Sequence, residues 1–411
     1  MKRNNQKIPE GWSVKKISDL GTTVSGGTPD TNNPEYWDGD VLWVTPSEVS
    51  ALSNRFIWDT ERKITEKGLK QSSAKLLPVN SLIICTRATI GDCCINKKPI
   101  CTNQGFKNII VTGNNVDFLY YLISKNKHEL IRKACGSTFL EISKKDIDNL
   151  KFPIPPLPEQ EKIAEILGTW DEAIEKLSSL IEQKKLLKKG LMQKLLTGKV
   201  RLPGFTQPWK EVKLDEIGTT YMGLSGKNKD NFGQGSYFIP YMNIYQNNRI
   251  NPQQLELVEV GEGEKQNIVK YGDIFFTTSS ETPKEVGFAS VLLFKPEQNI
   301  YLNSFCFGYR LNDFQSLLPE YASFLFRSTQ ARKIMYKLAQ GATRFNLSKN
   351  ELMKEKIYIP SNISEQHAIA EVLSTADDEI NLLNQKLEAT KEQKKGLMQQ
   401  LLTGNIRVKV N

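Results

Sequence analysis

Apolar residues recur at alternating intervals of three and four in two long segments of the chain. In the first segment the apolar positions are Ile174, Leu177, Ile181, Leu191 and Leu195, with Lys184 and Lys188 at the two places before Leu191. In the second segment they are Ile380, Leu383, Leu387, Leu397 and Leu401, with Thr390 and Lys394 in the corresponding places. This heptad pattern is typical of helices that pack along a seam. We predict two long helices that pair with each other, and a polar middle layer that fixes their register.

Proline and glycine set the expected limits of these helices. Four prolines at 153, 155, 156 and 158 predict a rigid, non-helical lead-in. The first helix is then expected from near Glu159 to Gly198 and the second from near Glu365 to Gly404. About 39 residues at ~1.5 Å each give a rod of ~58 Å. An antiparallel pair is favoured, because a domain lies between the helices and returns the chain; the alternative is that each helix packs only on its own domain.

The two helical segments are copies of each other. Residues 159–198 and 365–404 are offset by 206 positions and are identical at 22 of 40 places. The flanks repeat more loosely, around Trp12 and Trp209 and again at 136–144 and 341–349. Between these markers the halves diverge almost completely. We therefore expect the two shared segments to have the same function. We expect the two divergent segments to have related functions that differ in detail.

This division predicts four segments: divergent domains at 1–155 and 202–360, and helical segments at 156–201 and 361–411. Short strands are expected at 81–86, 108–111 and 273–277, and helices at 119–135 and 317–340. The predicted fold class is α+β. Two mixed α/β domains would be separated by two long helices, which would form an antiparallel coiled coil with a pseudo-twofold internal repeat.

Charge permits a polyanionic partner. The 411 residues include 55 Lys and Arg against 46 Asp and Glu, a net charge of +9. The divergent domains carry +6 and +2, and the helical segments +2 and −1. An excess of this size is compatible with nucleic acid binding. No apolar run approaches the ~18 residues of a membrane helix, and the basic start lacks an apolar signal core. A cytoplasmic chain with no membrane partner is expected.

Patterns that carry catalysis are scarce. His128 and His367 are the only histidines, which argues against His-based catalysis and multi-His metal sites. No phosphate-binding loop and no methyltransferase signature occurs. Residues 29–30 and 61–63 match a short nuclease pattern, Pro-Asp with Glu-x-Lys, but the pattern is common. We predict no catalytic residues in this chain.

Five of the six cysteines lie in the first third of the chain. Cys85, Cys93, Cys94 and Cys101 lack the spacing of a zinc knuckle. Reduced, mostly buried thiols are therefore favoured over a zinc site. No metal site is predicted.

Polar, Gly-rich loops punctuate both divergent domains, at 25–29, 86–91, 103–105 and 277–282. Arg and Lys suit guanine edges, Asn and Gln suit adenine, and Ser and Thr suit phosphates. Ordinary turn chemistry is the alternative for any single loop residue. The helix lysines at 184, 185, 188 and 189 are similarly either phosphate ligands or a solvated face.

In these features the chain resembles the specificity subunits of type I restriction-modification systems. The resemblance covers the whole chain in order. It rests on Glu159-Gln160-x-x-Ile163-Ala164 with its second copy, on the twice-seen Lys-Lys-Gly-Leu-Met-Gln-x-Leu-Leu-Thr-Gly, and on Gly26-Gly27-Thr28-Pro29 followed by Tyr36-Trp37.

The resemblance implies a non-catalytic DNA-recognition subunit of a multisubunit restriction endonuclease and adenine methyltransferase. Each divergent domain would be a target recognition domain that reads one half of a split, asymmetric site in double-stranded DNA. The coiled coil would set the spacing and dock two modification subunits, and restriction subunits would join them. S-adenosylmethionine, ATP and Mg would bind those partners, and no cofactor would bind this chain. The alternative is a self-contained nuclease or methyltransferase with a duplicated specificity region.

Motif-matched positions and side-chain chemistry give the candidate DNA contacts. In the first domain they are Arg87, Thr89, Gln104, Lys107, Thr138, Ser143 and Lys144. In the second domain they are Ser279, Lys284, Ser304, Arg344, Asn346 and Lys349. The second domain opens with a Gly-rich stretch at 223–227 that lacks the Thr-Pro and Tyr-Trp of the first. Its contacts are therefore expected to differ.

Overall fold

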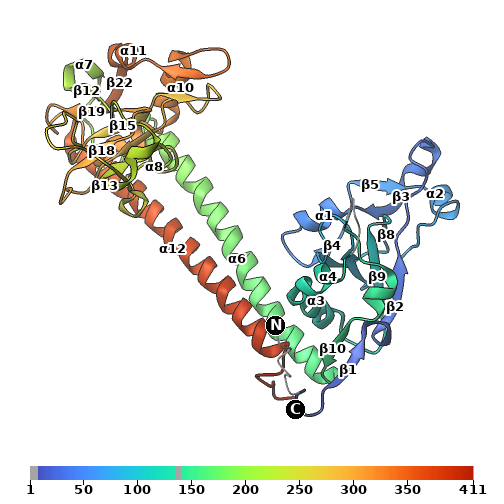
Figure 1. Ribbon diagram of the computed structural model, residues 1–411. Coiled ribbons are helices and arrows are strands. Elements are labelled where there is room, and N and C mark those ends of the chain that lie inside the picture. The colour runs from blue at the N-terminus through green and yellow to red at the C-terminus, as the bar shows by residue number, and fades with distance from the viewer. Residues whose placement is uncertain (1–7, 135–139, 411) are drawn as a thin grey trace. The chain divides into compact units, whose positions relative to one another are not determined.

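The computed structural model describes residues 8–134 and 140–410. The chain forms two compact units. The first unit is Met1–Leu180 with Asn384–Asn411, and the second is Ile181–Leu383. Each unit therefore combines one divergent domain with part of each long helix, and many of their elements are labelled in Figure 1.

The first unit is built from short strands and short helices. Its strands are β1 (Ser13–Lys16), β2 (Gly21–Ser25), β3 (Trp37–Val44), β4 (Phe56–Ile57), β5 (Arg62–Ile64), β6 (Leu82–Cys85), β7 (Cys93–Asn96), β8 (Cys101–Thr102), β9 (Phe106–Val111) and β10 (Lys151–Ile154). Its short helices are α1 (Pro46–Ala51), α2 (Glu66–Lys70), α3 (Val116–Lys125), α4 (Lys127–Lys133) and α5 (Lys144–Asp148), with 3-10 turns η1 (Ile17–Asp19) and η2 (Pro34–Tyr36).

The central sheet of the first unit has the order β2-β9-β6-β7-β4. A second sheet has the order β5-β3-β8, and β1 pairs with β10. Successive strand residues point to opposite faces. Leu82 and Ile84 of β6 pack in one buried cluster with Phe118 of α3, whereas Ile83 and Cys85 pack in another cluster with residues of β3. The central sheet is thus a middle layer, buried on both faces.

The second unit repeats this plan with different residues. Its strands are β11 (Trp209–Lys213), β12 (Gly218–Met222), β13 (Phe232–Ile239), β14 (Glu256–Val258), β15 (Ile274–Thr277), β16 (Ser279–Ser280), β17 (Ala289–Val291), β18 (Ile300–Leu302), β19 (Cys306–Leu311), β20 (Ala339–Gln340), β21 (Phe345–Leu347) and β22 (Lys356–Pro360). Its short helices are α7 (Leu214–Ile217), α8 (Tyr241–Gln246), α9 (Pro319–Leu325), α10 (Thr329–Leu338) and α11 (Lys349–Lys354), with 3-10 turns η3 (Lys229–Asn231) and η4 (Pro252–Gln254).

The sheets of the two units correspond strand by strand except at β4, in whose place the second unit has an isolated bridge between Arg249 and Val291. The order β12-β19-β15-β17 matches β2-β9-β6-β7, the order β14-β13-β18 matches β5-β3-β8, and β11-β22 matches β1-β10. The sheet β16-β21-β20 has no counterpart among the described strands of the first unit. The predicted strands are confirmed as β6, β9 and β15. The internal repeat in the sequence is therefore also a repeat of fold.

The two long helices are present as α6 (Leu157–Leu195) and α12 (Ile363–Leu401), each of 39 residues. The prediction that Pro158 lies outside the helix is wrong. It occupies the first turn of α6, where a missing N–H costs no helical hydrogen bond. The predicted glycine stops are confirmed: Gly198 and Gly404 have φ of 67° and 70°, the left-handed conformation that closes a helix.

The helices expected at 119–135 and 317–340 are each broken in two. In the first, α3 ends at Lys125 and α4 begins at Lys127. Asn126 lies between them with φ −99° and ψ 21°, and its side-chain amide donates to the carbonyl of Leu122 at 2.8 Å. The second stretch divides into α9 and α10, where Ser328 caps α10. The apolar period continues across both breaks, so the pattern alone predicts one helix.

In each unit, an arginine that follows one long helix binds a buried glutamate at the start of the other. In the first unit Arg407, which follows α12, binds Glu159 at the start of α6 at 2.7 Å. In the second unit Arg201, which follows α6, binds Glu365 at the start of α12 at 2.5 Å. The two glutamate side chains are 4% and 1% exposed. Arg201 and Arg407 are 206 positions apart, as are Glu159 and Glu365, so the two contacts are copies of each other.

The lysines of the predicted polar layer bind acidic residues of the other helix. Lys394 pairs with Asp171 in the first unit, and Lys188 pairs with Asp377 in the second. Lys184 lies 2.6 Å from Glu379. Of the predicted seam, five residues are buried and five are half-buried. The buried ones are Ile181, Leu195, Ile380, Leu387 and Leu401, and the half-buried ones are Ile174, Leu177, Leu191, Leu383 and Leu397.

Candidate nucleic-acid interface

A loop follows the central strand of each divergent domain, and the same hydrogen bonds hold both loops. In the first domain the amide and hydroxyl of Thr86 donate to the carbonyl of Gly105, at 2.7 and 2.9 Å. In the second domain the amide and hydroxyl of Thr278 donate to the carbonyl of Phe305, at 3.0 and 2.7 Å. The backbone framework of the two candidate DNA-contact loops is therefore shared.

The adjoining turn repeats as well but carries different side chains. The Oδ1 atoms of Asn103 and Asn303 accept the amides of Gly105 and Phe305, both at 2.8 Å. A Cβ atom on Gly105 would lie 3.0 Å from Oδ1 of Asn103 and 3.7 Å from the Cβ of Arg87, so this turn is tight and lies next to the arginine. Phe305 instead places a ring on the surface that is 61% exposed. One framework thus presents two chemistries.

Arg87 is held at the surface of the first domain by an acidic residue. Its Nη2 donates to Oε2 of Glu141 at 2.6 Å, and Nζ of Lys107 lies 3.6 Å from Oε1 of the same carboxylate. The Arg87 side chain is 44% exposed, whereas Lys107 is buried and its burial lowers the pKa of its amine. Burial pushes the pKa of Glu141 up, but Arg87 and Lys107 lower it overall. Arg87 faces solvent, and Lys107 supports it from beneath.

Two further candidates lie close to Arg87 in the same loops. Gln104 is exposed in the turn, and its Oε1 accepts a hydrogen bond from the hydroxyl of Thr28. The hydroxyl oxygen of Thr89 is buried, so in the free chain it faces the interior of the loop. Gln104 is therefore the more accessible of the two.

The remaining candidates of the first domain are at helix α5 and just before it. The Oγ of Ser143 accepts the amide of Asp146 at 3.1 Å, which caps the helix. Lys144 is half exposed and pairs with Asp148 at 2.9 Å. Thr138 lies outside the described residues.

The second domain has a cavity of about 380 Å³ at the equivalent loops. It brings together two candidates, Ser279 and Arg344. The rest of its lining is Tyr241, Met242, Tyr245, Ser280, Glu281, Glu285 and Phe305. Met242 is 50% exposed, and Arg344 is exposed. The cavity combines apolar surface with one cation and two carboxylates.

The other candidates of the second domain are outside this lining. Ser304 and Lys284 are exposed, on the turn before Phe305 and on the loop after β16. Asn346 pairs through its backbone with Ser279, next to the cavity. Lys349 opens α11, where its Nζ lies 3.2 Å from the sulfur of Met222.

Sequence reasoning missed Glu141, Met242 and Phe305. Glu141 is 54 residues from Arg87 along the chain, so no local pattern relates them. Met242 and Phe305 look like core residues in sequence. The signal that identifies Phe305 is its place two residues after Asn303, which matches Gly105 after Asn103.

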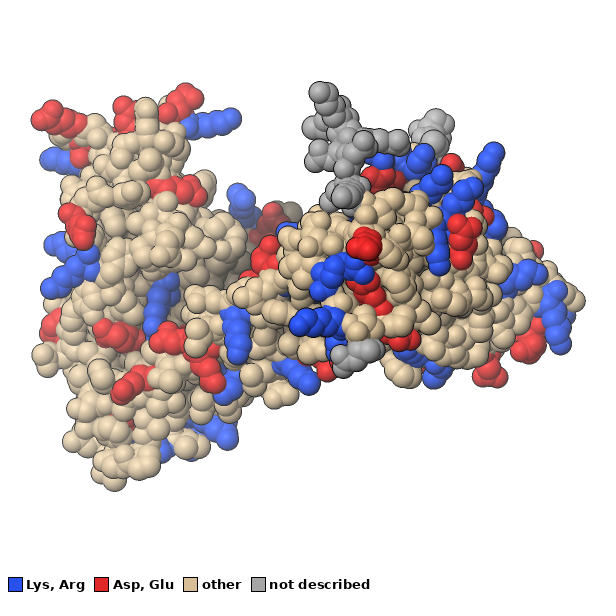
Figure 2. Space-filling model, turned by 90° about the horizontal axis from the view of Figure 1, so that it is seen from below, with Lys and Arg blue, Asp and Glu red and all other residues tan. Residues whose placement is uncertain are grey.

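Charged side chains of both signs are interspersed on the face of the molecule in Figure 2. The net excess of +6 in the first domain is therefore not gathered into one continuous basic area on that face. Single loop side chains such as Arg87, rather than a broad basic surface, are therefore the candidates for base-edge contacts.

The cysteines at 85, 93, 94, 101 and 306 are free thiols. Cys85, Cys94, Cys101 and Cys306 are buried, and burial raises the pKa of the Cys85 and Cys101 thiols to about 12. Over residues 8–134 and 140–410, no cluster of three or more His, Cys, Asp or Glu is arranged to hold a metal ion. No helix in the same ranges is long and apolar enough to span a membrane.

Comparison with known proteins points to one family. The family model for the type I restriction modification DNA specificity domain matches twice, at residues 9–183 and 206–392. The MjaIX specificity subunit of Methanocaldococcus jannaschii is 41% identical over 172 residues, which are 41% of this chain and 40% of that protein. The MjaVIII specificity subunit of the same organism is 24% identical over 98% of this chain and 95% of its own length.

Solved structures share the fold. A type I S subunit from M. genitalium superposes with a TM-score of 0.56 at 16% identity, over 98% of this chain and 97% of its own. A chain from a study of type I complex assembly and conformational transition gives 0.60 at 17% identity, over 97% and 100%. Because two copies of the family domain cover most of its length, the chain belongs to the type I restriction-modification specificity subunits.

Proposed function

We propose that each divergent domain reads one half of a bipartite, asymmetric DNA site and that the chain itself carries no catalytic centre. The observation that carries this proposal is the repeated loop framework. Thr86 and Thr278 hold equivalent loops by equivalent bonds, yet one loop presents Arg87 and the other a Phe305-lined cavity. Arginine suits guanine, and an apolar surface suits the thymine methyl group. The two recognition domains share a loop framework but differ in their exposed side chains, which favours two different half-sites.

We further propose that α6 and α12 form an antiparallel coiled coil that sets the spacing of the half-sites. Support comes from the ion pairs within each unit, which join Asp171 to Lys394 and Asp377 to Lys188. A buried or half-buried polar layer of this kind fixes register and orientation. In this proposal S-adenosylmethionine, ATP and Mg bind the modification and restriction subunits, which supply methylation, translocation and cleavage.

The proposed function predicts the form of the methylated motif. In cells that carry this chain with its modification and restriction subunits, sequencing of methylated adenines should give two different half-sites with a fixed spacer. Replacing residues 202–360 by the second domain of a relative should change one half only. A single continuous motif would contradict the proposal, and so would methylation or cutting of DNA by the purified chain alone.

Exposed leucines on the long helices are the surface we propose for docking the two modification subunits. Leu186, Leu187 and Leu382 are 68%, 57% and 66% exposed. Large apolar side chains at this exposure favour a protein contact. The double variant Leu186→Glu, Leu187→Glu should reduce co-purification of the modification subunits by about tenfold or more.

The matched control for the leucine variant is Lys176→Glu, a charge reversal on the same helix at a side chain that is 81% exposed. It should leave co-purification unchanged. Equal loss in both variants would show that added negative charge on α6, and not loss of the leucines, disrupts the complex. Unchanged co-purification in the leucine variant would place the docking surface elsewhere.

A further inference from the structure

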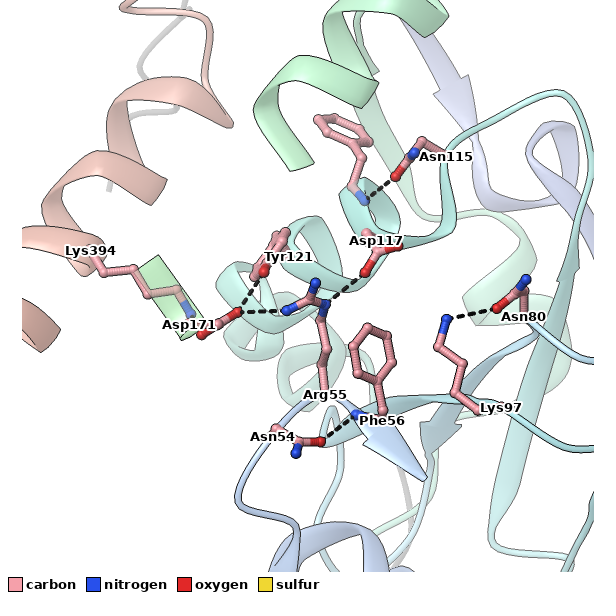
Figure 3. A network of polar contacts seen from close by, with 11 residues as sticks. Asn54, Arg55, Phe56, Asn80, Lys97, Asn115, Asp117, Tyr121, Asp171 and Lys394 are labelled. Atoms are coloured by element: carbon pink, nitrogen blue, oxygen red, sulfur yellow. Dashed lines mark hydrogen bonds and ion pairs between the residues drawn. The ribbon is translucent and has the colours of Figure 1, made fainter. Parts of the chain in front are cut away.

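A polar network joins four elements within the first unit: the loop before β4, helix α3, helix α6 and helix α12 (Figure 3). Its charged members are Arg55, Asp117, Asp171 and Lys394, two cations and two anions. Their side chains are between 15% and 26% exposed. A partly buried network with balanced charges contributes more to stability than exposed surface ion pairs do, and it forms only when its side chains have a defined geometry.

Asp171 on α6 is the centre of the network. Its Oδ2 accepts the hydroxyl of fully buried Tyr121 at 2.5 Å and Nη1 of Arg55 at 3.3 Å, and its Oδ1 accepts Nζ of Lys394. The three donors come from α3, from the loop before β4 and from α12. One carboxylate therefore fastens the recognition domain at two places to one helix and binds the other helix as well.

Arg55 completes the link on the side of the recognition domain. Its Nε donates to Asp117 of α3 at 2.6 Å, and its guanidinium lies over the ring of Phe56 at 4.4 Å. Burial lowers the pKa of Arg55, but its bonds to Asp117 and the neighbouring charges raise the pKa overall, so the cation persists. A Cβ atom on Gly168 of α6 would lie 3.2 Å from Nη2 of Arg55. Glycine at 168 thus makes room for the guanidinium.

The second unit has a corresponding but weaker junction. Arg249 lies over the ring of Phe324 at 5.1 Å, as Arg55 lies over Tyr121 at 5.7 Å. Phe324 has no hydroxyl, and Arg249 donates instead to the hydroxyl of Ser374, the residue that matches Gly168. The buried Nε of Arg249 has no hydrogen-bond partner among the described residues. The carboxylate links of Arg55 are therefore a feature of the first domain.

We propose that Arg55 and Asp171 fix the orientation of the first recognition domain on its helices, and that they act as positioning residues for the length of DNA spacer the assembled complex accepts. This inference rests on the proposed bipartite reading. Adding one base pair moves a half-site by about 3.4 Å and rotates it by about 35°. A domain fixed to the helices through α3 and the loop before β4 rejects such a displaced half-site, and a domain released at Asp171 follows it.

The test measures methylation by the complete complex on DNA in which both half-sites are kept and the spacer varies in single base pairs. The wild-type complex should prefer one length. Arg55→Ala should lower the ratio between that length and its neighbours about tenfold or more, with both half-site sequences still required. Tyr121→Phe, which installs the residue found at Phe324, should lower the ratio by a smaller factor.

Arg132→Ala is the matched control, since Arg132 is in the same domain, 68% exposed and paired only with nearby Glu129 within the described residues. It should keep the wild-type spacer profile. Tyr121→Phe removes only a single hydroxyl group. It therefore keeps the test decisive if the Arg55→Ala chain does not assemble into the complex. An equal fall at every spacer length in both variants, or an unchanged profile, would overturn the inference. A wild-type complex without a bipartite motif would instead overturn the proposed function.

Discussion

Adding one heptad to each long helix should move the preferred DNA spacer of the assembled complex to a length about three base pairs greater. Seven helical residues add about 10 Å, and base pairs rise by about 3.4 Å. The insertions belong at 180–181 in α6 and 383–384 in α12, where the chain passes from one compact unit to the other. Methylation at the parental spacer should fall by two orders of magnitude or more, since it demands both half-sites at once.

The twist of DNA also affects the activity expected of the lengthened variants. Three base pairs also rotate one half-site by about 100° relative to the other, so the one-heptad variant should methylate its new optimum more slowly than the wild type methylates its own. Three heptads add about 31 Å, close to the 34–36 Å of one DNA turn. The three-heptad variant should therefore recover more activity, at a spacer about nine base pairs longer.

The control for helix length is an insertion in α6 alone. With α12 unchanged, the pair Asp171–Lys394 on one side of the insertion and the pair Lys188–Asp377 on the other can no longer both form along two straight helices. This variant should lose methylation at all spacers. If the variant with both insertions kept the parental spacer, the helices would not measure the site, and the recognition domains would be positioned by the partner subunits.

The helical part of this protein could be predicted from sequence because its signals are local. Alternating apolar spacing identified α6 and α12, and the glycines at 198 and 404 marked their ends. The β-branched stretches identified β6, β9 and β15. The arginine contacts to Glu159 and Glu365 were within reach too: Arg201 and Arg407 repeat at the same offset of 206, just beyond the glycines.

The rest depends on contacts between distant residues. Arg87 was chosen for its chemistry, but what holds it in place is Glu141, which reaches it only once β6 and the segment before α5 are folded. Lys107 looked like a surface cation and is buried on the central sheet, where it supports Glu141. The network at Asp171 joins positions 55, 121, 171 and 394. No periodicity relates such positions, and only the packed domain brings them together.

Replacing Arg87 by alanine should relax recognition at one base pair of one half-site. The half-exposed guanidinium is held by a single nitrogen, Nη2, against Glu141 at 2.6 Å, which leaves donors for the edge of a guanine. Loss of a bidentate contact to guanine costs about 1–3 kcal/mol, so discrimination at that base pair should fall about 10- to 100-fold. The measurement is methylation by the whole complex on sites randomised at each position in turn.

Ser279→Ala is the matched control, because Ser279 follows Thr278 as Arg87 follows Thr86. It should leave the first half-site unchanged and affect only the second. Arg87→Lys separates the two roles of the arginine: it keeps the charge for a phosphate but loses the planar fork that pairs with guanine. Arg87 would instead bind phosphate if the Arg87→Lys complex kept full methylation activity. The same would follow if Arg87→Ala weakened binding to every DNA sequence equally and made binding less dependent on salt. Selective loss at one base pair in both variants would assign Arg87 to a guanine.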